Sequence, residues 1–88
     1  MQGDTVIVRT YGNKPLIRRV WNVISGIVFI TNDEYFKTLS EGGYAPMPIG
    51  FKIEDIFIYD MASLQIVKNI NRSNDIDWSV LKPWKPPI

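Results

Sequence analysis

Three segments in the first third of the chain have the residue pattern of β-strands. Residues 5–11, 16–24 and 27–31 are rich in β-branched and aromatic side chains, which favour a pleated backbone. Turn-forming residues at 12–15 separate the first two segments, and only Ser-Gly at 25–26 separates the second from the third. A two-residue connection is typical of a β-hairpin. The sequence therefore predicts three consecutive antiparallel strands.

A helix is predicted immediately after the third strand. Thr31 and Glu34 have the spacing of a capping box, in which the Thr hydroxyl accepts a hydrogen bond from a helix amide and the Glu carboxylate reaches back. The glycine pair at 42–43 can adopt the left-handed conformation that ends helices. These features predict about three helical turns, starting just after Thr31 and lying near residues 32–42.

The second half of the chain contains one further clear strand. Two prolines in the linker 44–48 prevent regular secondary structure there. A short strand is predicted at 49–51. Residues 56–59, Ile-Phe-Ile-Tyr, all favour β-structure and are predicted to form the last main strand of the sheet.

The segment 61–70 fits two patterns. Its apolar residues recur at every second position, as in a strand, and also at every third, as in a helix. We favour the helix because Asp60 can cap its start. Residues 75–81 favour a further helical turn capped by one of their aspartates, and the proline-rich stretch 82–87 is predicted to be extended.

Length and composition indicate one globular domain with one core. The chain has 88 residues, of which 45% are hydrophobic and 22% charged, as in ordinary globular proteins. One apolar stripe of each element would face the core. The predicted buried residues are Val6, Val8, Val20, Val28, Phe36, Leu39, Ile56 and Ile58.

The order of these elements resembles that of a known group of small barrels. Residues 3–8, followed by a turn, a long second strand, a tight turn and a third strand, resemble the opening of SH3-like barrels. Residues 49–59 are similar to their close, in which a short strand, a helical turn and a final strand complete the barrel. The resemblance covers residues 3–60, with 32–48 as an insertion, and it carries no functional residue with it.

This resemblance implies a mainly β fold with a helical insertion, of the α+β class. Residues 1–60 would form a small antiparallel SH3-like barrel with the inserted helix near 32–42. Residues 61–88 would form a C-terminal helix and proline-rich tail that pack on the same domain.

The residue content excludes several kinds of chemistry. With no cysteine and no histidine, the chain lacks thiol nucleophiles, the commonest general base and the commonest zinc ligands. Glu54 and Asp55 are adjacent and are better explained as capping or solvated groups than as an acid-base pair. The glycines at 42–43 lack the spacing of a phosphate loop. We therefore expect no enzyme activity, no metal and no cofactor.

Charge is distributed unevenly along a chain whose net charge is only +1. The first 31 residues are net basic, whereas residues 32–60 are net acidic. The longest apolar run, 27–30, is too short to cross a bilayer, so we expect no membrane association and a cytoplasmic location.

One group of residues on the first two predicted strands is a candidate binding site. Arg9 and Tyr11 would share a face of one strand, and Arg19 and Trp21 a face of the next, because side chains alternate. Arg18 would point to the opposite face and be peripheral. Arginines beside aromatic rings can hold planar or acidic ligands. The alternative is that Trp21 belongs to the core and the arginines only surround it.

Two functional classes fit these observations. The first is a small non-catalytic binding module, regulatory or mediating protein-protein interaction, with a protein partner. The alternative is a nucleic-acid-binding barrel that uses the arginine and aromatic face of the first two strands, although the acidic middle of the chain would repel phosphates. The sequence indicates neither the identity of a partner nor an oligomeric state.

Overall fold

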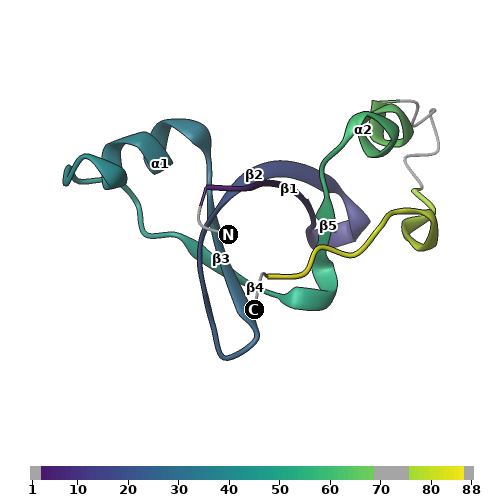
Figure 1. Cartoon of the computed structure of the whole chain (residues 1–88), viewed down its shortest axis with the longest axis horizontal. Helices are drawn as coiled ribbons and strands as arrows, with labels where there is room; N and C mark the ends of the chain where they lie inside the picture. Colours follow the sequence, from purple (N-terminus) through teal and green to yellow (C-terminus); the bar gives the residue numbers. More distant parts are fainter. Residues whose placement is uncertain (1–2, 69–75, 87–88) are drawn as a thin grey trace.

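The structure is a computed structural model that describes residues 3–68 and 76–86 (Figure 1). Within these residues it is an α+β fold with one five-stranded antiparallel sheet and two α-helices. The strands are β1 (Thr5–Arg9), β2 (Pro15–Ile24), β3 (Ile27–Thr31), β4 (Ile49–Lys52) and β5 (Ile56–Ile58). The helices are α1 (Asp33–Ser40) and α2 (Met61–Lys68), and the single turns of 3-10 helix are η1 (Tyr11–Asn13), η2 (Ile53–Asp55) and η3 (Trp78–Val80).

The three consecutive antiparallel strands predicted from the sequence are confirmed. β1 ends at Arg9 rather than at the predicted Tyr11, because the amide and hydroxyl of Thr10 each donate to the carbonyl of Lys14 at 2.8 Å and close a turn. The hairpin between β2 and β3 turns through Ser25 and Gly26, whose φ angles of 50° and 78° are those of a turn that matches strand twist.

The main core lies on one face of the sheet, which we call the inner face. It consists of buried residues from β1, β2, β3 and β5 together with one tryptophan from the C-terminal segment: Val6, Val8, Val20, Val28, Ile30, Ile56 and Trp84. A second cluster, Ile7, Phe57 and Leu81, lies on the opposite, outer face and packs against partly buried residues of α2 and of the segment around η3. β1 is therefore buried on both faces.

The predicted burial is confirmed for Val6, Val8, Val20, Val28 and Ile56. Phe36 and Leu39 are only half-buried, and so is Ile58. Figure 1 shows α1 beside the sheet rather than over it, on the side opposite to α2. The Phe36 ring packs against Arg19 and Trp21 on the outer face of β2, so α1 does not cover the main core on the inner face.

The sheet is not closed into a barrel, and the predicted resemblance to SH3-like barrels is wrong. Its strands follow the order β4-β3-β2-β1-β5, so β4 and β5 are the two edges. Figure 1 shows a strongly curved sheet. The outer edge of β5 pairs with the C-terminal segment instead of β4: Ile58 N donates to Lys82 O at 2.8 Å, and Trp84 N to Ile56 O at 3.0 Å. The C-terminal segment therefore occupies the amide and carbonyl groups of β5 that would have to pair with β4 to close a barrel.

A β-bulge in β2 changes which side chains share a face. Val20 lies opposite Ile30, but Asn22 lies opposite Phe29, so Trp21 is an extra residue between the two pairs. Directly opposed residues point to the same side of a sheet. Val20 therefore faces inward, and Trp21 and Asn22 both face outward.

The helix termini differ in detail from the prediction. Asn32, not Thr31, caps α1, and its Oδ1 accepts a hydrogen bond from Tyr35 N at 2.7 Å. Thr31 is instead the buried last residue of β3. The predicted stop is confirmed, since Gly42 has a φ of 80° and its amide donates to Leu39 O.

The helix favoured for 61–70 is confirmed as far as Lys68, with Asp60 as the predicted cap. Residues 69 and 70 lie outside the described part of the chain. Of the predicted turn at 75–81, η3 is present, and Asp77 accepts a hydrogen bond from Ser79 N. Neither helix in the described ranges is long and apolar enough to span a bilayer.

Candidate functional site

The guanidinium of Arg9 is paired with groups of the fold itself. Its Nε and Nη2 lie 2.9 Å and 2.8 Å from Asp55 Oδ1, and Nη2 also donates to the carbonyl of Glu54. The guanidinium stands over the rings of Phe57 and Trp78, at 5.4 Å and 5.5 Å from their centroids. These contacts join the end of β1 to η2 and η3, a structural role.

Arg19 and Trp21 meet at α1, as two outward-facing residues of β2. Arg19 Nε donates to Gly3 O at 2.7 Å, and its Nη1 is 3.2 Å from Asp33 Oδ1. The guanidinium lies 4.3 Å from the centroid of the Phe36 ring, which also packs edge-on against Trp21 at 5.6 Å. This cluster attaches α1 to the sheet.

The five residues of the predicted site therefore do not form one surface. Arg19 lies opposite Thr5 at one end of β1, whereas Arg9 lies at the other end. Tyr11 is fully exposed in the turn beyond β1 and shares no strand face with Arg9. Arg18 points to the inner face, as alternation requires, because it lies opposite the core residue Val6.

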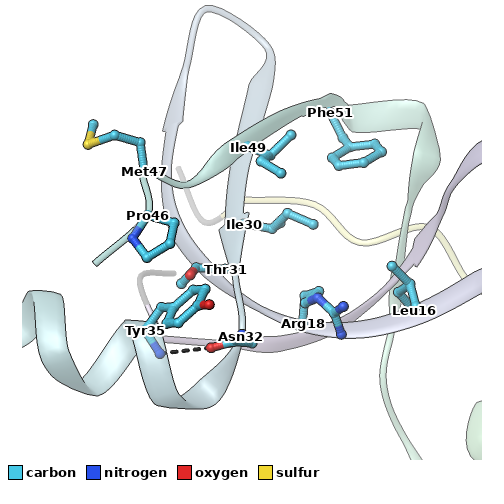
Figure 2. Close-up of a pocket in the computed structure, with 10 residues that line it drawn as sticks. All are labelled: Leu16, Arg18, Ile30, Thr31, Asn32, Tyr35, Pro46, Met47, Ile49 and Phe51. Atoms are coloured by element: carbon cyan, nitrogen blue, oxygen red, sulfur yellow. Dashed lines mark hydrogen bonds between the residues drawn. The ribbon is translucent and has the colours of Figure 1, made fainter. Parts of the chain in front are cut away.

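Arg18 lines a pocket of about 220 Å³, which we call the Arg18 pocket. Figure 2 shows Leu16 and Arg18 along β2 facing Ile49 and Phe51 of β4, with Ile30 between them. The full lining is Leu16, Arg18, Ile30, Thr31, Asn32, Tyr35, Pro46, Met47, Ile49 and Phe51. Most of these side chains are apolar, so the pocket is a hydrophobic hollow with one cation at its wall.

Among the described residues that line it, the pocket contains one positive charge, that of Arg18. The Arg18 guanidinium donates to the carbonyl of its own neighbour Ile17 at 2.9 Å. Among the residues that the structure describes, no carboxylate lies within ion-pair distance of Arg18, in contrast to Arg9 and Arg19. The Asn32 amide oxygen is already used as the α1 cap (Figure 2). A guanidinium beside apolar walls can form charge-assisted hydrogen bonds with a carboxylate.

A second pocket, of about 170 Å³, lies on the outer face of β2 and β3, and we call it the Trp21 pocket. It is lined by Trp21, Asn22, Ile24, Phe29, Met47 and Pro48. It exists because the bulge turns both Trp21 and Asn22 outward. Met47, which is 80% exposed, lines both pockets.

Sequence reasoning placed Arg18 at the periphery and missed the pocket around it. The pocket is built from four separate segments: β2, the end of β3 with α1, the linker before β4, and β4 itself. One signal was present in the sequence. The linker carries Met47 between two prolines and leads into Ile49, and both side chains are largely exposed apolar groups.

No protein-family model, curated protein or solved structure matches this chain. Within residues 3–68 and 76–86 no group of three or more acidic side chains is placed to hold a metal ion. The Arg18 pocket combines one guanidinium with a mostly apolar lining.

Proposed function

We propose that this protein is a non-catalytic binding module for a protein partner, and that the Arg18 pocket receives an apolar side chain lying next to a carboxylate. The observation that carries the proposal is the state of Arg18. It is the basic residue of an apolar pocket, and it is paired with no carboxylate of the described chain. A ligand carboxylate would supply that counter-charge.

The energetics favour a ligand with both properties. A hydrogen bond to a charged group contributes about 1.5–3 kcal/mol. Apolar surface removed from water contributes roughly 25 cal/mol per Å². A volume of about 220 Å³ has room for one branched aliphatic side chain and its acid group, but not for a large cofactor.

Nucleic-acid binding through the early arginines stays a prediction, and the structure adds no observation in its favour. Arg9 and Arg19 are each occupied by a carboxylate of the chain and stacked on aromatic rings. Their positive charge is therefore largely compensated before any phosphate approaches.

The test uses a small acid of matched shape. We expect 4-methylpentanoate to shift the amide resonances of Arg18, Ile30 and Ile49 in a titration followed by NMR, because these residues line the pocket. The neutral analogue 4-methylpentanamide, and the acid with an Arg18→Gln variant, should each bind roughly tenfold more weakly, since each removes one charge-assisted interaction.

Lys14→Gln is the matched control, because it removes a positive charge from an exposed position that does not line the pocket. It should bind the acid like the unchanged protein. Equal affinities for acid and amide, or resonance shifts confined to other parts of the sheet, would contradict the proposed function.

A further inference from the structure

The two edges of the sheet differ in how they are covered. The edge of β5 is closed by the C-terminal segment, through an isolated bridge between Phe57 and Pro83 and the two backbone hydrogen bonds that flank it. β4 is the other edge, and no strand in the described residues pairs with its outer side. An uncovered edge presents unpaired amide and carbonyl groups to a further strand.

The two pockets lie on opposite faces of the sheet and share Met47, which comes just before β4. Ile49 and Phe51, opposite Ile30 and Val28, face inward and line the Arg18 pocket. Gly50 lies opposite Phe29 and so shares the face of the Trp21 pocket. A methyl group added to Gly50 would stand 2.7 Å from Ile27 Cγ2 and 3.2 Å from Phe29 Cε1, so the glycine leaves space for both side chains.

We propose that a partner segment binds as an extra β-strand along the outer edge of β4, with alternate side chains in the Arg18 and Trp21 pockets. This inference rests on the proposed function and names its binding mode. Successive side chains of a strand point to opposite faces, and the two pockets lie on opposite faces beside the same edge. A helix lying on the edge would present side chains to one pocket only.

The positive charge of Arg18 favours a partner segment that carries an acidic residue over a second copy of β4. The side chains of β4 are Ile49, Phe51 and Lys52, besides Gly50. A second β4 paired antiparallel would present isoleucine and phenylalanine on the inner face and its lysine on the outer face, so it would bring no carboxylate to the Arg18 pocket. The expected ligand therefore has glutamate or aspartate between aliphatic residues on one face, and β-branched residues on the other.

The probe is the blocked peptide acetyl-Thr-Leu-Val-Glu-Val-Leu-Thr-amide, which has this alternation. Hydrogen exchange followed by NMR should show alternate backbone amides of β4 slowed at least tenfold when the peptide is saturating, because only those amides gain a partner. Two N-methylated versions of the peptide, each lacking a different pair of amide hydrogens, are compared with each other. One carries methyl groups on the amides of both valines, and the other on the amides of the glutamate and the second leucine.

In a strand, one of these two sets of amides points at β4 and the other points away. We therefore expect one N-methylated peptide to bind at least tenfold more weakly than the other. Equal binding by both, or binding that leaves exchange in β4 unchanged, would overturn strand addition and leave the proposed function standing. No binding at millimolar peptide would likewise overturn strand addition.

Two further outcomes separate the alternatives. Equal binding of the Glu→Gln peptide would count against the proposed function, while strand addition would still be decided by the N-methyl pair. If β4 amides are protected in concentrated protein alone and lose protection on dilution, the occupant is a second copy and the partner proposal is overturned.

Discussion

Arginines on neighbouring strands have different surroundings in this fold. Arg9 and Arg19 each stack on an aromatic ring and pair with an aspartate, and each joins the sheet to another element. Arg18 has an apolar environment and a backbone carbonyl as its partner. Residue type alone therefore does not distinguish a structural cation from a cation that is available to a ligand.

At this scale we predict effects of different size on stability for two alanine substitutions. Arg9→Ala should lower the free energy of unfolding by about 1–2 kcal/mol, because it removes an ion pair and two ring contacts. Arg18→Ala should change it by less than about 0.5 kcal/mol. Urea denaturation measures both.

Arg9→Met is the control, since it keeps the apolar stem and loses the charge, and its loss should be intermediate. An Arg9→Ala variant with unchanged stability and weakened acid binding would contradict this assignment and restore Arg9 to the binding face.

At the scale of elements, α2 depends on a local cap. Asp60 Oδ1 accepts a hydrogen bond from Ser63 N at 2.8 Å, at the start of the helix that covers the outer face of β1 and β5. This backbone hydrogen bond and then the hydroxyl of Ser63, with a smaller contribution from the charge of Lys82, lower the pKa of Asp60 below its usual value of 3.8. The ionised carboxylate is therefore the form that the folded protein prefers.

The sign of the pH effect follows from this lowered pKa. A carboxyl group with a lower pKa in the folded state stabilises the fold above its unfolded value of 3.8, and this contribution is lost as the pH falls through the folded pKa. Asp60→Asn should keep a capping oxygen but remove this part of the acid dependence. Urea midpoints measured from about pH 6 to about pH 2 would show a flatter profile.

Asp77 provides the comparison, because its pKa is also lowered, mainly by the hydroxyl of Ser79 and then by the Ser79 amide. Asp77→Asn should flatten the profile over the same acidic range while leaving the Asp60 contribution in place. A profile for Asp60→Asn that coincides with the unchanged protein at every pH would show that the charge of Asp60 does not contribute to stability.

At the scale of the whole molecule, Trp84 connects the end of the chain to its core. Its ring is 7% exposed within the main cluster, its amide bonds to β5, and its Nε1 donates to Asp4 at 3.3 Å. The C-terminal segment thus fills the inner face and covers one edge of the sheet at the same time.

We expect Trp84→Ala to cost about 3–5 kcal/mol, the usual loss for removing a large aromatic side chain from a core. That is a large fraction of the stability of a small domain. Trp84→Phe, which keeps a ring, should cost less. A loss within experimental error, measured by thermal or urea unfolding, would show that this segment only covers the surface.

The sequence by itself determined the features that depend on neighbours a few residues apart. Turn chemistry at Ser25 and Gly26 specified the hairpin, Gly42 ended the first helix, and the cap at Asp60 was predicted correctly. The β-branched patterns located the strands that form the main core. These signals are local because backbone conformation and short-range hydrogen bonds decide them.

Tertiary structure alone decided which edges and charges are satisfied. Whether the sheet closes depended on the pairing of β5 with Lys82 and Trp84, far along the chain. The partner of Arg9 is 46 residues away, and the Arg18 pocket combines four segments. No local pattern encodes such distances, because long-range contacts are selected by how all the elements pack together. The binding site that we propose arises at that level, where folding left Arg18 without a carboxylate partner and the edge of β4 without a strand partner among the described residues.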